Sequence, residues 1–364
     1  MFISKLSLTT FRSYKNLELD FKPGINIFIG KNGEGKTNIV ESILYLSFLS
    51  SHRVASDQPL VQLGNTAAYI RSTVTNPERD ILVELEINSE KSNRAKINQN
   101  PTRSQKELFG IVQAIYFSPE DLDLVRGDPS ERRRFIDQIL ILRSPRMAGI
   151  ISDYERAVRQ RNTLLKTRAG FDSLAPWDKQ VAEHGGKIIS ARLKTLKDLM
   201  PLFTKIYQDI SEEKPASIAY KSSIEEPTDN HENNTIKILE RMQSTRSQEI
   251  DRGLTLTGPH RDDLVLNLGQ HIVKGYASHG ESWSIALSLK LATFHLLRNE
   301  GLSPILILDD VFSELDEDRR LQLIELAKNA EQTFITVAVE NDLPTELHGE
   351  RYFVKSGVVT QVKK

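Results

Sequence analysis

The sequence predicts an α/β fold in which a lobe built on a mixed β-sheet is interrupted by a largely helical lobe. Three observations lead to this prediction. A glycine-rich loop lies between a short apolar strand and a helix. A second apolar strand, which ends in two aspartates, follows more than 270 residues later. The residues between these features read mainly as charged helices. We therefore expect residues 1–118 and 296–364 to form one lobe and residues 119–295 to form the inserted lobe.

The composition excludes several classes of protein. The chain has 364 residues, no cysteine and a formal net charge of −1. Disulfides and thiolate metal sites are therefore excluded, and the lack of cysteine is typical of a reducing compartment. The sequence shows neither a signal-peptide pattern nor an apolar run long enough for a membrane span, so we expect a cytoplasmic protein with no membrane contact. A nucleic-acid partner would need a local basic surface, because the overall charge does not supply one.

The first part of the chain is rich in predicted strands. Apolar residues at positions 17, 19 and 21 alternate with polar ones, as on a half-buried strand. Residues 68–74, 81–87 and 95–97 have the composition of further strands. We expect these segments to form an antiparallel layer attached to the lobe that carries the glycine-rich loop.

The glycine-rich loop fits the pattern G-x-x-x-x-G-K-[ST] of a phosphate-binding P-loop. It consists of Gly30, Lys31, Asn32, Gly33, Glu34, Gly35, Lys36 and Thr37. The glycines let backbone N–H groups converge on a phosphate, and the helix expected from Asn38 to Phe48 points its positive end at the anion. We expect Lys36 to reach the β- and γ-phosphates of ATP as a catalytic residue, Thr37 to bind Mg²⁺, and Asn38 to contact the nucleotide.

The middle of the chain reads as helical and charged from about residue 118 to residue 200. Asp128 and Pro129 are a strong helix start, and further helices are expected over 150–165 and 177–199. Residues 225–234 are polar and are expected to form an exposed loop. A strand over 264–268 and a helix over 281–297 follow. The spacing leaves no room for a long coiled coil.

A buried strand that ends in two carboxylates is expected near the C-terminus. Residues 305–308 form an apolar run typical of a strand covered on both faces, and Asp309 and Asp310 follow it. We expect Asp309 to hold Mg²⁺ with Thr37, and Asp310 to orient or deprotonate an attacking water as a catalytic residue. A helix over 317–329 and a strand over 333–339 then predict a parallel sheet. The alternative interpretation is an acidic pair in solvent at a strand end.

Two weaker signals accompany these motifs. Residues 278–282 (SHGES) open the helix expected over 281–297, and Ser278 and Gly280 at a helix start suit an anion. Residues 313–316 (SELD) directly follow the acidic pair. Each signal alone is typical of an ordinary helix cap, and only the order of the motifs along the chain gives them weight.

This order resembles the ATP-binding-cassette (ABC) ATPase heads, which carry a P-loop, an inserted lobe, a signature helix, an acidic strand and a D-loop. Within that superfamily the chain resembles the RecF family of bacterial recombination mediators. The residues that carry this resemblance are 11–14 (FRSY), 117–122 (FSPEDL), 129–135 (PSERRRF), 160–162 (QRN) and 257–263 (TGPHRDD).

The resemblance implies an ATP-dependent homodimer in which Ser278 and Gly280 of one copy touch the γ-phosphate bound by the other, so that Ser278 is a catalytic residue. It also implies binding to gapped DNA or single-strand–double-strand junctions, and RecR and RecO proteins as partners. Asp310 stands where transporters of this superfamily carry Glu, which implies a weak ATPase with slow hydrolysis. Thr336 stands in place of a histidine that senses the γ-phosphate, and Gln113 is a candidate for the Q-loop glutamine.

Basic charge is concentrated in the inserted lobe. Residues 126–168 contain eleven Lys or Arg and five Asp or Glu, an excess of six positive charges. A solvated helix surface with local ion pairs would explain this excess. The resemblance favours DNA binding instead, and the candidate contacts are Arg132, Arg133, Arg156, Arg159 and Arg161.

Three further positions are candidates for contact with an anion, DNA or a metal, and two of them allow a second interpretation. Arg12 begins a loop next to the P-loop strand and is a candidate for phosphate contact, and Arg53 is either near phosphates or DNA or an ordinary surface residue. His260 with Asp262 and Asp263 could form a metal cluster, but a Thr-Gly-Pro turn with local capping is favoured.

Together these observations predict an ATP-gated DNA clamp that works in recombinational repair, replication restart and the SOS response, with slow hydrolysis for release. Two alternatives from other classes remain open. One is a motor or transporter subunit of the same superfamily. The other is a non-hydrolysing nucleotide switch that acts as a protein scaffold.

Overall fold

The computed structural model describes residues 1–168, 170–211 and 214–362. The chain divides into two compact units. Unit 1 comprises Met1–Asp121 and Leu297–Lys364, and unit 2 comprises Leu122–Leu296. These limits lie within three residues of the lobe boundaries expected at residues 118 and 296.

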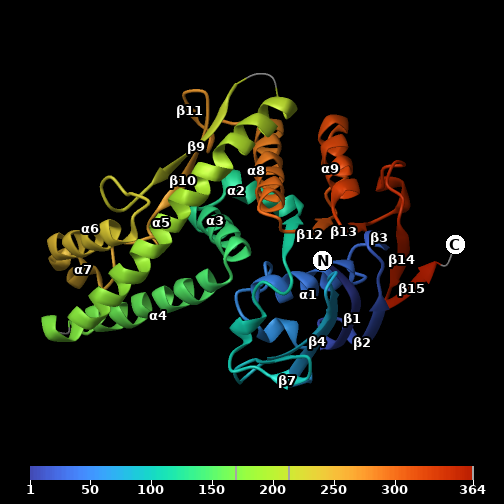
Figure 1. The fold of residues 1–364 in the computed structure, drawn as a ribbon, viewed down its shortest axis with the longest axis horizontal. Helices are drawn as coiled ribbons and strands as arrows, with labels where there is room; N and C mark the ends of the chain where they lie inside the picture. Colours follow the sequence, from blue (N-terminus) through green and yellow to red (C-terminus); the bar gives the residue numbers. More distant parts are fainter. Residues whose placement is uncertain (169, 212–213, 363–364) are drawn as a thin grey trace. The chain divides into compact units, whose positions relative to one another are not determined.

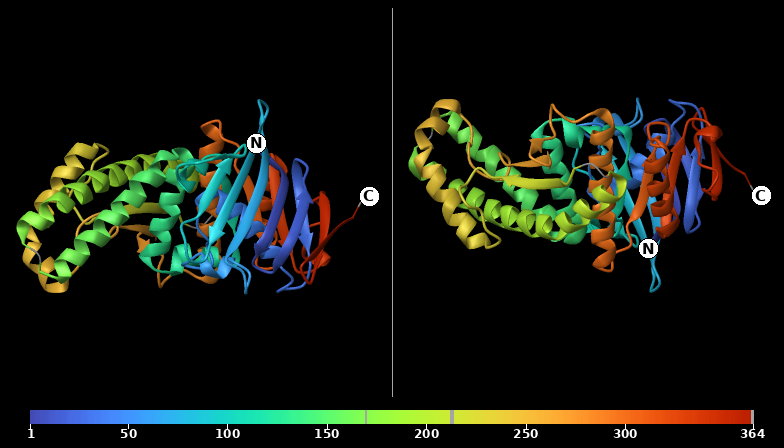
Figure 2. Two further views of the ribbon diagram at one scale, coloured as in Figure 1. Left: turned by 90° about the horizontal axis from the view of Figure 1, so that it is seen from below. Right: turned by 90° about the horizontal axis from the view of Figure 1, so that it is seen from above.

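Unit 1 contains an antiparallel six-stranded sheet formed mostly by the N-terminal residues (Figures 1 and 2). Its strand order is β2 (Tyr14–Asp20), β1 (Phe2–Phe11), β4 (Ala67–Thr75), β5 (Asp80–Asn88), β6 (Arg94–Ile97) and β7 (Asn100–Pro101). Side chains along β2 and β4 alternate between buried and more exposed positions, because one face of the sheet packs on the core. This sheet is the antiparallel layer expected from the alternating sequence pattern.

The second six-stranded sheet of unit 1 is mainly parallel. Its order is β15 (Val358–Val362), β14 (Glu350–Lys355), β3 (Gly24–Ile29), β13 (Gln332–Val337), β12 (Ile305–Asp309) and β8 (Ala114–Phe117), and only β15 is antiparallel to its neighbour. All five residues of β12 are buried, as expected for a strand covered on both faces. The parallel strands align the carboxyl ends of β3 and β12 on the two sides of β13, at one edge of the sheet.

One hydrophobic core joins the two sheets of unit 1 through helix α1 (Lys36–Phe48). Ile39 and Ile43 of α1 belong to the same cluster as Ile70 of the first sheet and Ile307 of the second. Helix α9 (Glu317–Asn329) packs near β3, at the bounds that the sequence predicts. The P-loop helix is therefore held in a fixed position under the edge where the parallel strands end.

Unit 2 consists of helices and a small three-stranded sheet (Figure 1). The helices are α2 (Asp123–Arg126), α3 (Pro129–Arg143), α4 (Arg146–Lys166), α5 (Phe171–Ile210), α6 (His231–Ser244), α7 (Arg246–Arg252) and α8 (His279–Asn299), whose last turn lies in unit 1. The sheet order is β11 (His271–Ile272), β10 (Asp263–Leu268) and β9 (Ala216–Lys221). Helix α5 packs along α4 and α6.

Two predictions for unit 2 differ from the structure. Helix α5 extends well beyond the expected 177–199 at both ends. It contains Pro176 and Pro201, one just before and one just after the expected range, and proline is normally unfavourable inside a helix. The expected loop over 225–234 ends early, because the Asn230 side chain caps α6 by accepting hydrogen bonds from two backbone N–H groups.

Two expected absences concern the helices. The described residues form no long coiled coil, in agreement with the sequence. Within the same part of the chain, no helix combines the length and the apolar character that a membrane span requires.

Candidate nucleotide-binding site

The P-loop adopts a conformation that depends on its glycines. Gly33 and Gly35 have φ angles of +86° and +110°, which residues with a Cβ rarely adopt. Gly30 lies against β14, where an added Cβ would come within 2.2 Å of the Val354 carbonyl oxygen. The hydroxyl of Tyr14 donates a hydrogen bond to the Gly35 carbonyl at 3.1 Å. The loop is therefore held in a fixed curve at the start of α1.

Three side chains from distant parts of the sequence meet at this loop. Thr37 Oγ1 donates to Asp309 Oδ1 at 3.3 Å, although the two residues are 272 positions apart. Lys36 is buried, and its Nζ donates to the Gly30 carbonyl at 2.7 Å. A hydroxyl and a carboxylate at this spacing, next to a lysine at the glycine-rich loop, fit the groups that a Mg²⁺–triphosphate requires. The structure brings these residues together as expected, and their roles toward nucleotide and metal stay predictions.

Asp309 is held by two hydroxyl groups that the sequence did not identify as its partners. Tyr116 donates to Oδ2 at 2.9 Å, and Thr336 donates to Oδ1 at 2.5 Å. Burial, together with the charge of Asp309, raises the pKa of Tyr116, so this phenol keeps its proton and remains a donor. Thr336 is fully buried, and its hydroxyl also accepts a hydrogen bond from the Asp310 N–H at 3.1 Å, so it contacts both aspartates; its place beside the γ-phosphate stays a prediction.

Asp310 occupies a strained position at the end of β12. Its φ angle is +51°, and its Oδ2 lies 3.9 Å from Lys36 Nζ. Burial raises the pKa of Asp310, the charge of Lys36 opposes this rise, and the charge of Asp309 adds to it. Non-glycine residues with such angles cluster at functional sites. A carboxylate whose pKa is raised above its usual range is a better proton acceptor, which suits the role predicted for Asp310.

A pocket of about 580 Å³ lies beside the P-loop in unit 1. It is lined by Arg12, Ser13, Asn38, Arg53, Gln58, Pro59, Val61, Gln62 and Leu63. Arg12 and Asn38 were expected near the nucleotide, whereas residues 58–63 carry no motif that would have identified them. Leu63, which lines this pocket, is 99% exposed.

The Q-loop candidate does not reach this site. Gln113 precedes β8, and the parallel pairing of β8 with β12 matches Ala114 to Ile305 and Phe117 to Leu308. Gln113 therefore lies at the amino end of the strands, whereas Asp309 lies at the carboxyl end. Its assignment to the nucleotide site is wrong.

The expected signature segment lies in unit 2 at the start of α8. Ser278 and Glu281 form a reciprocal cap: the Ser278 N–H donates to Glu281 Oε2 at 2.7 Å, and the Glu281 N–H donates to Ser278 Oγ at 3.1 Å. Arg126, which had no predicted role, donates to Ser282 Oγ at 3.1 Å. Ser278 is exposed, and Gly280 lies within the same turn.

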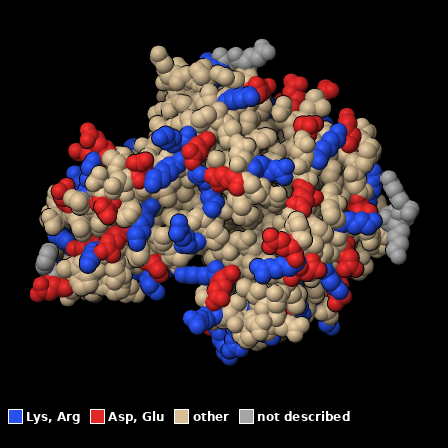
Figure 3. Space-filling view, in the orientation of Figure 1, with Lys and Arg blue, Asp and Glu red and all other residues tan. Residues whose placement is uncertain are grey.

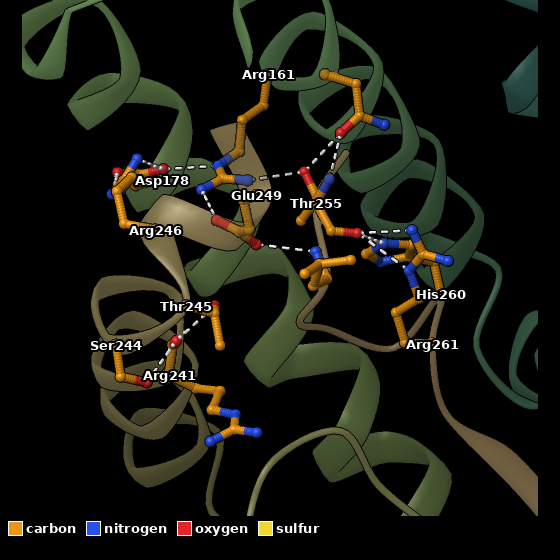
Figure 4. A network of polar contacts seen from close by, with 12 residues as sticks. Arg161, Asp178, Arg241, Ser244, Thr245, Arg246, Glu249, Thr255, His260 and Arg261 are labelled. Atoms are coloured by element: carbon orange, nitrogen blue, oxygen red, sulfur yellow. Dashed lines mark hydrogen bonds and ion pairs between the residues drawn. The ribbon is translucent and has the colours of Figure 1, made fainter. Parts of the chain in front are cut away.

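Two of the five arginines expected to contact DNA are buried in ion pairs. Arg161 is 0% exposed and donates to Asp178 at 2.7 Å, to Glu249 at 2.5 Å and to Thr255 at 2.9 Å (Figure 4). Arg132 is buried and forms two hydrogen bonds with Asp263, at 2.8 and 3.0 Å. The expectation that Arg132 and Arg161 bind DNA is wrong, because a phosphate cannot reach either group.

The remaining candidates differ in exposure. Arg133 is partly buried and donates to the Asp262 carbonyl at 2.9 Å, while Arg156 and Arg159 are exposed on α4. The last two form surface ion pairs with Asp153 and Glu155, which contribute little energy. On the face drawn in Figure 3, basic and acidic residues are interspersed.

The His260 segment forms a network of hydrogen bonds. His260 contacts the hydroxyl of Tyr154 at 2.5 Å and the Thr255 carbonyl at 3.1 Å, and the side chain of Asp262 accepts from Tyr220 and from the Ser223 N–H. Among the described residues, no group of three or more His, Asp or Glu is placed to share a metal ion. The turn interpretation of this segment agrees with these contacts.

Comparison with known proteins places the chain in a family. Residues 2–355 match the model of the RecF/RecN/SMC N-terminal domain. The chain is 47% identical to the DNA replication and repair protein RecF of Streptomyces avermitilis over 375 residues, with both chains fully covered. It is 46% identical to the protein of the same name from Rhodococcus erythropolis, over 98% of this chain and 94% of that one.

Solved structures give the same result for the fold. A structure of the recombination mediator protein RecF-ATPrS in the RecFOR pathway superposes with a TM-score of 0.91 at 27% identity, over 100% of this chain and 98% of that one. An Smc head bound to the winged-helix domain of ScpA superposes with a TM-score of 0.58 at 16% identity, over 100% and 97% of the two chains, which shows a shared fold only. From its full-length similarity and the P-loop geometry, we conclude that the chain belongs to the RecF family of the RecF/RecN/SMC group.

Proposed function

We propose that this chain is an ATP-dependent DNA-binding protein of recombinational repair. The observation that carries the proposal is the meeting of Thr37 and Asp309, 3.3 Å apart, beside the buried Lys36. Family membership supports it, since the similar proteins are named DNA replication and repair protein RecF, and a second similar structure is described as RecF-ATP in the RecFOR pathway.

The residues of unit 1 fit ATP with Mg²⁺. Lys36 would give up its hydrogen bond to Gly30 and donate to the β- and γ-phosphates, while the loop N–H groups converge on the same oxygens. Thr37 and Asp309 would hold Mg²⁺, with Tyr116 and Thr336 keeping the Asp309 carboxylate in one orientation. Mg²⁺, when bound, neutralises charge on the phosphates.

The pocket next to the P-loop suits the other end of the nucleotide. Asn38 and Ser13 lie at its P-loop side, and Leu63 offers an exposed apolar surface for one face of a base. Burying that leucine against a base would remove apolar area from water, which is favourable. We therefore place the base and sugar of ATP along residues 58–63.

Asp310 would act on the attacking water. Its carboxylate lies near Lys36, and the raised pKa makes it a better base than an ordinary aspartate. It is one methylene shorter than the glutamate at this position in transporters, so we propose a weak ATPase, stimulated by DNA.

Dimer closure would complete the site. Ser278 is exposed at the start of α8, and Gly280 follows two residues later in the first turn, where the N-terminus of a helix suits a phosphate. We propose that these residues of one copy cover the ATP bound by the P-loop of a second copy, with residues 313–316 along the interface. Slow hydrolysis would then reopen the dimer.

Bound DNA would be held through its backbone. The exposed arginines Arg156 and Arg159 on α4 are the strongest remaining candidates, and Arg133 is a weaker one because it is partly buried. We propose gapped DNA or single-strand–double-strand junctions as the target in the cytoplasm. The RecFOR pathway of the similar structures supports RecO and RecR as partner proteins and the loading of recombinase as the outcome.

Sedimentation of the purified chain with ATP, ADP or no nucleotide tests this proposal. We expect a monomer that becomes a dimer with ATP and Mg²⁺ only. Lys36→Ala should abolish the dimer, because the β- and γ-phosphates lose the lysine that would bind them. Lys22→Ala removes a surface lysine that is paired with Glu350 in the same unit, and it should leave the dimer unchanged. A wild-type chain that neither binds ATP nor dimerises would refute the proposal.

A further inference from the structure

Glu41 is a fully buried carboxylate on the helix that follows the P-loop. It lies on α1 five residues after Lys36, and its side chain is 0% exposed. A buried carboxylate without partners is strongly unfavourable. The neighbours of Glu41 therefore have to supply opposite charge and hydrogen bonds.

Two arginines and a serine satisfy this carboxylate. Arg12 donates to both of its oxygens, from Nε at 2.9 Å and from Nη2 at 2.6 Å. Ser51 Oγ donates at 2.6 Å, and Arg53 Nη1 lies 3.4 Å from Oε2. Burial on its own would raise the pKa of Glu41, but the hydrogen bonds and the arginine charges outweigh it and hold the pKa below its ordinary value. Glu41 is therefore an anion bound by groups from two different loops.

The same two arginines form part of the wall of the pocket beside the P-loop. Arg12, Arg53 and Asn38 line the pocket, and Glu41 lies behind them. Arg53 Nη1 also donates to Asn38 Oδ1 at 3.1 Å, and Asn38 Nδ2 donates to Ser13 Oγ at 2.9 Å. Contacts thus run from Arg12 through Glu41, Arg53 and Asn38 to Ser13, the residue next to Arg12.

The charged side chains in this series of contacts do not cancel one another. Arg12, Arg53 and Glu41 together carry one net positive charge, and the described residues that line the pocket include no carboxylate. The negative charge of Glu41 is buried, whereas the guanidinium groups border the pocket. This arrangement presents fixed cations to an anionic ligand and keeps their counter-charge out of its reach.

We propose that Glu41 is a positioning residue that holds Arg12 and Arg53 in the orientation needed to meet a phosphate of the nucleotide at the P-loop. The inference rests on the proposed function, because it takes ATP as the ligand. Two other roles for Glu41 give different results on mutation. A purely electrostatic role predicts tighter ATP binding when the negative charge is removed, and a purely structural role predicts lower stability with unchanged affinity.

The test is ATP binding by the Glu41→Gln variant, measured by calorimetry with Mg²⁺, beside its thermal unfolding. Gln keeps the shape of the side chain but cannot hold the Arg12 guanidinium by two charged hydrogen bonds. We expect ATP affinity to fall by about tenfold, although the net charge of the site rises. Glu84→Gln is the matched control, since it removes a carboxylate paired with Arg71 elsewhere in unit 1 and should leave the affinity unchanged.

A double-mutant cycle with Arg12→Gln shows whether Glu41 acts through this arginine. We expect Glu41→Gln to cause less additional loss of ATP affinity in the Arg12→Gln background than in the wild type. Equal losses in both backgrounds would overturn the inference. If Glu41→Gln does not fold, the ATP affinity of Arg12→Lys is the test, because lysine keeps the positive charge but cannot form both hydrogen bonds with Glu41. An unchanged ATP affinity of Arg12→Lys would overturn the inference.

The outcomes separate this inference from the function on which it rests. A wild-type chain that fails to bind ATP refutes the proposed function. A wild-type chain that binds ATP, with a folded Glu41→Gln variant that binds it equally well or more tightly, overturns only the role of Glu41.

Discussion

Replacing Arg161 by glutamine is expected to destabilise unit 2 rather than to remove a DNA contact. The guanidinium is 0% exposed and lies between Asp178 and Glu249, which are also buried (Figure 4). Glutamine cannot supply a positive charge to either carboxylate. The variant would therefore leave two buried carboxylates short of their shared cation, which is a large penalty in a medium of low polarity.

The size of this effect follows from the partners that remain. Removing one member of a buried ion pair costs about 3–5 kcal/mol. Asp178 keeps Arg246, and Glu249 Oε1 keeps the Leu256 N–H at 2.8 Å, so we expect a value near the lower end, about 3 kcal/mol. For a unit of this size, each kcal/mol lowers Tm by roughly 2–4 °C. The expected decrease is therefore about 6–12 °C.

Thermal unfolding followed by circular dichroism measures this decrease, with Arg159→Gln as the matched control. Arg159 lies on the same helix, 68% exposed, and its pair with Glu155 contributes at most about 0.5 kcal/mol. Below the transition, Arg161→Gln should bind gapped DNA as the wild type does. A Tm within about 2 °C of the wild-type value, together with weaker DNA binding and a smaller salt dependence, would refute the argument from burial.

Three further predictions concern dimer closure, DNA and pH. Ser278→Arg should leave ATP affinity unchanged but prevent ATP-dependent dimerisation, and an unchanged dimer fraction in gel filtration would contradict the composite site. Neutralising Arg156 and Arg159 to Gln should weaken DNA binding and reduce its salt slope by about two, whereas equal affinity at all salt concentrations would exclude this face of α4. Burial lowers the pKa of His260 to about 4, so its contribution to stability is present above the unfolded-state pKa of about 6.5 and is lost as pH falls toward 4. We expect the unfolding free energy of the wild type to fall by up to about 3 kcal/mol across that window. In urea titrations, a His260→Asn variant should show a flatter dependence of unfolding free energy on pH. Identical profiles would contradict the role of His260 in this pH dependence.

The P-loop and the acidic strand could be predicted because their information is local. The spacing of the glycines predicts the loop, and a run of apolar residues followed by two aspartates predicts the end of β12. The meeting of Thr37 with Asp309 also followed, because parallel strands bring their carboxyl ends to the same edge of a sheet. The hydrogen-bond partners of Asp309 could not be predicted, because nothing in the sequence around Tyr116 and Thr336 indicates where their hydroxyl groups point.

The arginines of the helical unit show the limit of counting charges along the sequence. The excess of six positive charges over residues 126–168 omitted the carboxylates that pair with them from elsewhere. Arg132 pairs with Asp263 across 131 positions, and Arg161 pairs with Glu249 across 88. Charge density in a segment therefore overstates its basic surface whenever the fold brings acids from other segments into the same interior.

The motifs that carry the family resemblance divide into two physical kinds. In the P-loop, the buried Lys36 and the hydroxyl of Thr37 converge on a site for a phosphate, and Arg12 borders the adjacent pocket. In the 160–162 and 257–263 motifs, Arg161 bonds Thr255, whose carbonyl accepts from His260 and Arg261, so the polar groups satisfy one another inside unit 2. Mutations of Thr37 should change ligand affinity with little change in Tm, whereas mutations of Arg161 should do the reverse. Glu41 combines the two, because it is buried like the second kind and yet holds arginines that border the ligand pocket like the first. Affinity and stability measured together on the same variants therefore distinguish the two kinds of residue.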